Sequence, residues 1–513
     1  MGVSVQTDAS IIRSLQLQTE RDHERVAIEF EGSNITYGEF TNRVLRSAGS
    51  LGGLGVERGD VVALLGHNSP EYLEILLAAT ATGGVALPLN WRLAAPEIAY
   101  ILDHAEVRVL VIDAEFADLA RAAIDLTTRL VTIVEFGGST IGELATDDLR
   151  SLSPPIAPVA ADADDVARLM YTSGTTGRPK GVMITHGNVL WKNIAHLREL
   201  GITDRDTGLV VGPLYHVGAL DLTATTHLFA GAGMVIHRRF DAPSALAELA
   251  SGRISTTWLA PAMFRAVLVE AESTSTVCES VRCIIGGGEK TPLPMLERIR
   301  SSFPNMWYAD AYGLTETVSG DTFLPRSWAR RKAGSVGIAC FGIEIGILDA
   351  DDRHCAAGEE GEIVLRGPKV SIGYWKDPES TGRAFRNTWF HTGDIGYLDE
   401  DGFLYVVDRL KDMIISGGEN IASAEIERVL YEYPGVIEAA AVGSPDERWG
   451  EVPVAYVVIA DGGAVDEQTL IEHCRSRLAK FKVPKRVEFL SALPRNPSGK
   501  ILKRELRSPG GHR

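Results

Sequence analysis

Several residue types and patterns are scarce in this 513-residue chain, and each scarcity excludes a class of protein. The few cysteines form no CxxC pair; they are Cys278, Cys283, Cys340, Cys355 and Cys474. An odd, small number at these spacings argues against a disulfide framework or a zinc site and fits a reducing cytoplasm. No stretch reaches ~18 uninterrupted apolar residues, and the N-terminus lacks the pattern of a signal peptide. The sequence therefore predicts a cytoplasmic protein with no transmembrane segment.

Basic residues are also in deficit, since 51 Lys and Arg stand against 68 Asp and Glu for a net charge of −17. The average field of such a chain repels nucleic acid, which is therefore not an expected partner. A locally basic site remains compatible with this balance. The length exceeds the usual ~100–200 residues per domain several times over, so we expect more than one folding unit.

Short apolar runs alternate with helical patterns along the first half of the chain, which is typical of α/β units around a largely parallel sheet. Ser69-Pro70-Glu71 offers an N-cap, a proline at the first helical position and an early acid, and so predicts a helix start. Ala95-Pro96-Glu97 predicts another. The expected strands lie at 61–66, 84–89, 108–113, 130–134, 169–171, 209–211, 234–237 and 283–285.

The pattern changes after about residue 330 and again after Arg409. Residues 361–367 and 402–408 are short strands bounded by glycine or acidic turns, which favours an antiparallel or β-barrel-like subdomain. The last hundred or so residues look smaller and self-contained. We therefore predict an α/β protein of two domains. Residues 1–409 would form a large N-terminal domain of stacked α/β sheets, and residues 410–513 a small α+β C-terminal domain.

The sharpest local signal is the segment YTSGTTGRPKG at 171–181, where seven of eleven residues are Gly, Ser or Thr. It directly follows a predicted strand, so its hydroxyls and backbone N–H groups can cradle an anion. The run differs from a Walker A loop because no Gly-Lys-Ser/Thr is present. A flexible linker is less compatible with Pro179-Lys180 before a helix start at Thr185. The predicted phosphate-binding residues are Thr172, Ser173, Gly174, Thr175, Thr176 and Lys180.

This loop resembles the signature of the adenylate-forming superfamily of acyl-CoA synthetases, peptide-synthetase adenylation domains and luciferases. Further motifs agree in order and spacing across nearly the whole chain: PLYH at 213–216, DAYGLTE at 310–316, WFHTGD at 389–394, DRLKD at 408–412, SGGEN at 416–420 and PRNPSGK at 494–500. The sequence looks most like the AMP-forming fatty acyl-CoA and aryl-CoA ligases.

The resemblance implies ATP, Mg²⁺ and CoA as cofactors and assigns catalytic roles. Lys500 would bridge the acyl carboxylate and the α-phosphate, because cations must neutralise two anions brought together. Thr315 and Glu316 belong to the magnesium motif, and Glu316 would support Mg²⁺ together with Thr172. His216 would lie between the acyl pocket and the nucleotide as a gate or orienter, without binding metal.

The resemblance also implies a nucleotide site and a mobile C-terminal domain. Asp394 and Arg409 would bind the ribose, and Tyr312 would stack on the adenine. Lys411 occupies the hinge position, and Gly417 and Gly418 would face a pantetheine tunnel after the domain rotates. The backbone expected to line the adenine is that of Gly288, Glu289, Lys290, Asp310, Ala311, Tyr312, Gly313, Leu314 and Thr315.

The implied function is ATP-dependent activation of a fatty or aromatic carboxylic acid to an acyl-adenylate, followed by transfer to the CoA thiol. An alternative keeps adenylation but changes the acceptor to a carrier-protein thiol or an amine, including nitrite activation for diazotisation of an aryl amine. A non-enzymatic nucleotide-binding role is disfavoured because Thr172, Glu316, Asp394 and Lys500 are intact. A homodimer is compatible with all three.

Three departures from the family pattern keep the alternative acceptor open. Ala422-Ser423 stands where many CoA ligases read Tyr-Pro, and charged Glu289-Lys290 follow the glycines where fatty-acid enzymes often have Ala-Pro. Asp221 lies five residues beyond His216, where it could pair with a cationic substrate, cap a helix or face solvent. The predicted substrate pocket consists of His216, Asp221, Gly286 and Gly287.

Overall fold

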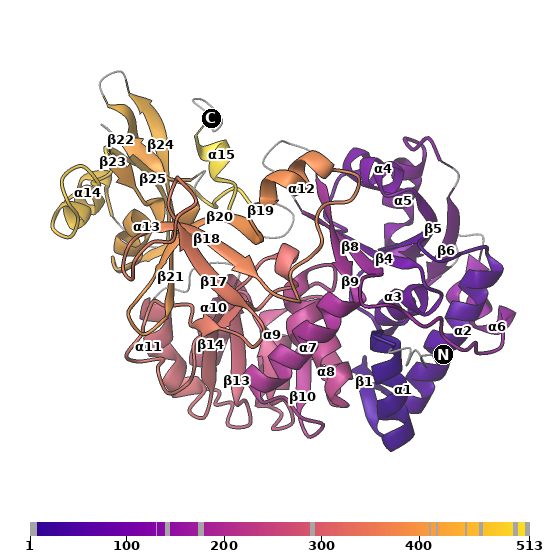
Figure 1. Ribbon diagram of the computed structural model, residues 1–513. Coiled ribbons are helices and arrows are strands. Elements are labelled where there is room, and N and C mark those ends of the chain that lie inside the picture. The colour runs from indigo at the N-terminus through magenta and orange to yellow at the C-terminus, as the bar shows by residue number, and fades with distance from the viewer. Residues whose placement is uncertain are drawn as a thin grey trace.

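The computed structural model describes residues 8–129, 131–138, 144–172, 179–287, 293–409, 412–416, 419–446, 449–460, 465–495 and 501–507. Within these ranges the chain forms a nine-stranded, a seven-stranded and two five-stranded sheets. Figure 1 shows the C-terminal sheet at one end of the molecule, next to the antiparallel sheet that precedes it in the chain.

The seven-stranded sheet has the order β7-β6-β5-β3-β4-β8-β9, and every pair in it is parallel except β8 with β9. Its strands are β3 (Val61–Leu65), β4 (Val85–Leu89), β5 (Val107–Asp113), β6 (Thr132–Phe136), β7 (Leu144–Ala145), β8 (Val166–Thr172) and β9 (Lys180–Thr185). The helices that connect or flank them are α3 (Pro70–Ala81), α4 (Ala95–His104), α5 (Ala117–Ile124) and α6 (Thr146–Leu152). Both predicted helix starts are confirmed, and the Ser69 hydroxyl caps α3 by accepting the Tyr72 N–H at 3.1 Å.

The nine-stranded sheet has the order β16-β15-β14-β13-β12-β10-β11-β1-β2, parallel from β14 to β1 and antiparallel at both edges. Its strands are β1 (Val26–Phe30), β2 (Ser33–Thr36), β10 (Thr207–Val210), β11 (Gly233–Ile236), β12 (Thr256–Trp258), β13 (Cys283–Gly287), β14 (Trp307–Tyr312), β15 (Thr322–Phe323) and β16 (Ile338–Ala339). Each of the eight strands predicted in the first 300 residues overlaps a strand of these two sheets.

The two large sheets share one core because side chains alternate between the faces of a strand. In β3, Val62 and Leu64 belong to the core between the sheets, whereas Val61, Ala63 and Leu65 face the outer helices α4 and α5. The middle layer contains α1 (Ile11–Arg21), α2 (Tyr37–Gly53), α7 (His186–Leu200) and α8 (Thr225–Ala230). On the outer face of the larger sheet lie α9 (Ala242–Ala250), α10 (Pro261–Ser273) and α11 (Leu293–Ser302). The stacked α/β architecture is as predicted.

The third sheet is antiparallel throughout, as the short strands after residue 330 predicted. It contains β17 (Glu344–Leu348), β18 (Gly361–Arg366), β19 (Phe385–Arg386), β20 (Trp389–Leu398) and β21 (Leu404–Arg409), with α12 (Pro378–Ala384) beside it. It joins the nine-stranded sheet through two backbone hydrogen bonds: Val336 N–H donates to the Leu404 carbonyl at 2.9 Å, and Leu404 N–H to the Gly337 carbonyl at 2.8 Å.

The C-terminal part is an α+β unit with its own apolar core. It contains β22 (Ile414–Ser416), β23 (Glu419–Ile421), β24 (Val436–Asp446), β25 (Gly450–Ile459), β26 (Arg486–Phe489), α13 (Ser423–Tyr431), α14 (Glu467–Arg475) and α15 (Lys503–Leu506). Ser423 N–H donates to the Asp408 carboxylate at 2.6 Å, and Arg265 on α10 pairs with Glu438 at 3.3 Å. These contacts join the C-terminal part to the larger body.

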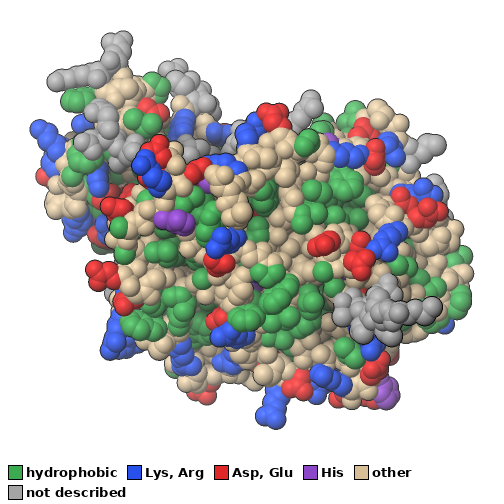
Figure 2. All heavy atoms as spheres, in the orientation of Figure 1, with side chains coloured by type: hydrophobic (Ala, Val, Ile, Leu, Met, Phe, Trp, Pro, Cys, Tyr) green, Lys and Arg blue, Asp and Glu red, His purple; other side chains and the backbone are tan. Residues whose placement is uncertain are grey.

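The surface is mixed, with charges of both signs around apolar areas (Figure 2). An apolar patch includes Trp191 and Ile194 on α7 together with Phe341, and the Trp191 and Phe341 ring centroids lie 6.1 Å apart. All five cysteines are unpaired thiols. Among the helices that the structure describes, none combines the length and apolarity needed to cross a membrane.

The Gly337 junction provides a test of how the sheets are joined. Gly337 has φ +99°, and a Cβ there would overlap the backbone of Phe323 and Leu324. Gly334 has φ +89° with open space around it. Gly337→Ala should therefore cost about 3 kcal/mol or more through overpacking and strain, and Gly334→Ala only about 1–2 kcal/mol through strain. Thermal unfolding of both variants measures the difference. Equal losses would contradict the close approach at Gly337.

Candidate active site

The predicted phosphate loop connects β8 to β9, and the antiparallel pairing of these strands sets Thr172 opposite Lys180. Both side chains are half-buried at the edge of the sheet. Ser173, Gly174, Thr175 and Thr176 lie outside the described residues. The structure therefore places both ends of the loop together and leaves its phosphate-binding role a prediction.

Lys180 and Glu316 are brought together by Tyr374, which the sequence did not single out. The Tyr374 segment runs along β9, where Trp375 N–H donates to the Gly181 carbonyl at 2.7 Å. The Lys180 ammonium lies 5.1 Å from the centre of the Tyr374 ring, and the Tyr374 hydroxyl donates to Glu316 Oε1 at 2.9 Å. Burial and the Glu316 carboxylate raise the pKa of Tyr374, so this hydroxyl stays protonated as a donor. The contact orients Glu316 beside the loop.

The donor set here fits Mg²⁺ bound together with a nucleotide. Glu316, on the 3₁₀ turn Thr315–Thr317, supplies a carboxylate, and Thr172 supplies a hydroxyl. Both are hard oxygen ligands, and Mg²⁺ usually combines one or two such groups with waters and substrate phosphates. Among the described residues no cluster of three or more His, Cys, Asp or Glu could hold a metal on its own. Glu316 and Thr172 would therefore hold an Mg²⁺ ion that the substrate phosphates also bind, rather than an ion held by the protein alone.

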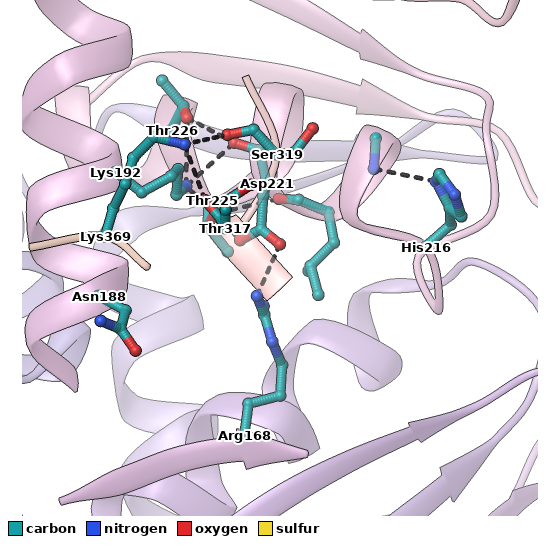
Figure 3. Close-up of polar contacts among 12 residues, drawn as sticks. Arg168, Asn188, Lys192, His216, Asp221, Thr225, Thr226, Thr317, Ser319 and Lys369 are labelled. Carbon is teal, nitrogen blue, oxygen red and sulfur yellow. Dashed lines mark hydrogen bonds and ion pairs between the residues drawn. The ribbon is translucent and has the colours of Figure 1, made fainter. Parts of the chain in front are cut away.

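A buried lysine, Lys369, holds the segment that follows Glu316 in the chain. Lys369 donates to the carbonyls of Thr317 at 2.7 Å and Ser319 at 2.6 Å, and pairs with Asp321 at 2.6 Å. Burial raises the pKa of Asp321, and the Lys369 charge opposes that shift. The Lys369 contacts with Thr317 and Ser319 (Figure 3) therefore fix the turn that carries Glu316.

The residues predicted to bind adenine and ribose also meet. Asp310, Ala311 and Tyr312 lie on β14, and the Tyr312 hydroxyl donates to Asp394 Oδ2 on β20 at 2.8 Å. Burial and the Asp394 charge raise the pKa of Tyr312 well above its ordinary value, so the hydroxyl remains a donor. The pairing of Asp394 with Arg409 joins the two ribose candidates through the backbones of β20 and β21.

Only some of the remaining residues predicted to bind the nucleotide or form the hinge lie within the described ranges. Gly286 and Gly287 pair with Asp310 and Ala311, so β13 ends beside β14. Gly313 and Leu314 follow β14 directly, before the turn that begins at Thr315. Gly288, Glu289, Lys290, Lys411, Gly417, Gly418 and Lys500 lie outside the described residues. Backbone contacts of Pro494 with Leu502 and of Arg495 with Ile501 bring together the ends of the segment that contains Lys500.

His216 is held in one orientation next to a tryptophan. Gly218 N–H donates to His216 Nδ1 at 3.0 Å, so the neutral ring carries its proton on Nε2. The ring stacks on Trp258 with centroids 5.6 Å apart and planes 24° apart. A Cβ at Gly212 or Gly218 would overlap the Trp258 indole, so these glycines make room for it. Trp258 is a neighbour of the predicted site histidine that the sequence analysis missed, because only the fold brings β12 to His216.

Asp221 is not a substrate contact, a helix cap or a solvent-facing charge, so the sequence-based expectations for it are wrong. It lies on the π-helix Gly218–Ala224 and is completely buried. Its carboxylate accepts from Arg168 at 2.6 Å and lies 3.6 Å from the Lys192 ammonium (Figure 3). Two buried basic side chains already contact this carboxylate, which separates it from any substrate cation.

The buried Lys192 predicts a pH dependence of stability. Burial lowers the pKa of Lys192 to about 7, and Asp221 opposes the shift. Between pH 7 and 9 the unfolded chain then binds more protons at this lysine than the folded one, so the contribution of Lys192 to stability rises with pH. The free energy of unfolding of wild type relative to Lys192→Met should increase, with a slope approaching ~1.4 kcal/mol per pH unit.

Denaturation curves at pH 7, 8 and 9 measure this slope. Lys480→Met, at an exposed lysine, serves as the control and should show no such trend. Parallel pH profiles of wild type and Lys192→Met would contradict the depressed pKa.

Comparison with known proteins agrees with this geometry. The AMP-binding enzyme family model matches residues 15–375, and the model of the AMP-binding enzyme C-terminal domain matches residues 425–500. A feruloyl-CoA synthase of Amycolatopsis sp is 41% identical over 482 residues, covering 94% of this chain and 95% of the relative. A long-chain-fatty-acid–CoA ligase of Mycobacterium tuberculosis is 38% identical over 476 residues, with 92% of each chain covered.

Solved structures give the same result. The o-succinylbenzoate CoA synthetase of Bacillus subtilis, in complex with its acyl-adenylate intermediate, superimposes with a TM-score of 0.85 at 34% identity, covering 96% of this chain and 98% of that one. The same enzyme has been solved with ATP and a magnesium ion. The chain belongs to the AMP-binding enzyme family, as its resemblance to the adenylate-forming acyl-CoA synthetases predicted.

Proposed function

We propose that this chain is an AMP-forming acid–CoA ligase that uses ATP, Mg²⁺ and CoA. The observation that carries the proposal is that Tyr374 contacts both Lys180 and Glu316, together with the Tyr312–Asp394 hydrogen bond. A phosphate-facing cation, a magnesium carboxylate and a ribose carboxylate are what activation by ATP requires. Relatives of 41% and 38% identity that are CoA ligases support the same function.

In the first step a carboxylate oxygen attacks the α-phosphorus, the bond to the β-phosphate breaks, and pyrophosphate leaves. Lys180 and, from the C-terminal part, Lys500 would neutralise the charge that develops. Mg²⁺ would supply further charge neutralisation at the phosphates, held by Glu316 and Thr172. In the second step the CoA sulfur attacks the acyl carbon and AMP leaves. His216, protonated on Nε2, can donate a hydrogen bond to the acyl group.

The acid that fits best is a compact aromatic one. Trp258 lies against Gly212 and Gly218, and its indole stacks on the His216 ring. An indole next to the histidine predicted to border the acyl group favours an aromatic acid over a long alkyl chain. The feruloyl-CoA synthase relative, named for an aromatic acyl product, is 41% identical, against 38% for the fatty-acid ligase, and supports this choice.

A carrier-protein or amine acceptor, or nitrite as the activated acid, gains no support from the described residues. Asp221 is neutralised internally. The departure from the family pattern at Ser423 has a structural explanation. The Ser423 N–H and hydroxyl both donate to Asp408, which joins the large and small parts of the chain. CoA therefore remains the proposed acceptor.

We also propose the boundary at 409/410 with Lys411 as the hinge, because β21 ends at Arg409 and the next strand joins a different sheet. The unpaired thiols support a reducing, cytoplasmic setting. A homodimer stays a prediction, for which the exposed Trp191–Phe341 patch is one candidate surface.

Pyrophosphate release measured over an acid panel tests the proposed function. We expect CoA-dependent formation of AMP and thioester, with kcat/KM for cinnamate or benzoate at least about 10-fold above that for palmitate, since pocket fit is worth ~1–3 kcal/mol. Trp258→Ala should narrow that ratio. Turnover that needs an amine instead of CoA would overturn the acceptor, and a preference for palmitate would overturn the acid class.

Lys500→Ala separates the two half-reactions. Loss of the bridging cation should lower pyrophosphate release about 10²-fold or more, while thioester formation from a pre-made acyl-adenylate stays within a few-fold of wild type. Lys480→Ala, at an exposed lysine of the same C-terminal part, is the matched control and should change neither step. Pyrophosphate release near the parental rate in Lys500→Ala would refute the role of Lys500.

A further inference from the structure

The histidine motif continues directly into an unusual helical turn. Residues Gly218–Ala224 form a π-helix in which every residue is buried. The Leu220 N–H donates to the His216 carbonyl at 3.1 Å, and the Gly218 N–H orients the His216 ring. The position of this turn therefore determines where the imidazole lies. π-Helical turns are rare and frequently lie at functional sites. We therefore expect specific contacts to stabilise this one.

Side chains from two other elements supply that support at Asp221. The Asp221 carbonyl accepts hydrogen bonds from the Lys192 ammonium at 3.0 Å and the Thr226 hydroxyl at 2.7 Å. Lys192 also donates to the Thr225 hydroxyl at 2.7 Å. The wide turn is thus held by side chains of α7 and α8 that converge on one residue (Figure 3).

The carboxylate of the same residue binds Arg168, which lies on β8 four residues before Thr172. The Arg168–Asp221 distance is 2.6 Å, and the two side chains are 3% and 0% exposed. One ion pair therefore connects the strand that leads into the predicted phosphate loop with the turn that carries His216.

Stability alone does not account for such a network. Removing buried charges from water is costly, and apolar side chains of similar volume often replace a buried ion pair without loss of stability. A guanidinium–carboxylate contact differs from apolar packing because it is directional. The ionic set is then best explained by the geometry that it imposes between β8 and the π-turn.

We propose that Asp221 is a positioning residue for acid activation, which holds His216 in register with the strand that bears Thr172. The proposal rests on the proposed function for its kinetic consequence, although the coupling of β8 to His216 is independent of it. Disrupting Asp221 should weaken use of the acid and leave ATP binding unaffected.

The decisive variant replaces the ionic set by apolar side chains: Arg168→Met, Lys192→Met and Asp221→Leu together. We expect a thermal midpoint near wild type, a KM for the acid raised at least 10-fold and a KM for ATP within twofold. Asp221→Asn keeps the side-chain shape but removes the charge. It should also raise the KM for the acid, and it should lower the thermal midpoint. A merely structural role predicts that the stable triple variant has wild-type KM values, and that result would overturn the proposal.

The matched control is an ion pair of the same length whose carboxylate is also buried. Arg150 on α6 contacts Glu74 on α3 at 2.6 Å, with Glu74 1% exposed, on elements that carry no predicted site residue. Glu74→Gln should lower the thermal midpoint and leave both KM values unchanged. A rise in the acid KM of this control equal to that of Asp221→Asn would show that destabilisation alone moves KM, which would also overturn the proposal.

A second readout does not need turnover. Diethyl pyrocarbonate modifies His216, and peptide mass spectrometry measures the rate of this modification. Relative to wild type, the rate should differ at least threefold in the triple variant and be unchanged in Glu74→Gln. If wild type activates no carboxylic acid, the proposed function fails, and this rate alone decides the positioning role. An unchanged rate in the triple variant refutes it.

Discussion

The antiparallel return of β9 along β8 is the interaction on which the rest of the site depends. It closes the predicted phosphate loop by setting Thr172 opposite Lys180. It also gives β9 a free edge in an otherwise parallel sheet, and the Tyr374 segment attaches there through Trp375 N–H to Gly181. Without this reversal, neither the cation nor the tyrosine that orients Glu316 would reach the loop.

Buried ion pairs support two turns that carry predicted site residues, in a chain whose net charge is −17. Lys369 with Asp321 supports the turn of Glu316, and Arg168 with Asp221 supports the turn of His216. Each pair is neutral as a unit, so it orients neighbouring groups without adding a long-range field. Under the proposed function, polyanionic ligands would be attracted by groups close to them, for which Lys180 is a predicted example, because local fields in a shielded site act more strongly than distant charges.

Local patterns predicted the elements of the fold well. The runs around Val61 and Cys283 are strands, and the α3 start at Ser69 is capped as expected, because burial alternation and capping depend on neighbours in sequence. The same approach was wrong about Asp221. Its partner Arg168 is 53 residues away, so nothing near Asp221 in the sequence indicates that its charge is neutralised internally. Trp258 and Tyr374 were missed for the same reason.

The sequence by itself determined the family, the α/β class and the order of the nucleotide motifs, because each motif is a short run whose chemistry is present in its own residues. Only the tertiary structure decided which side chains act together. Tyr374 meets Glu316 across 58 residues and Tyr312 meets Asp394 across 82. Such contacts depend on which strand edges and turns the sheets bring into register, and that depends on the packing of the whole core.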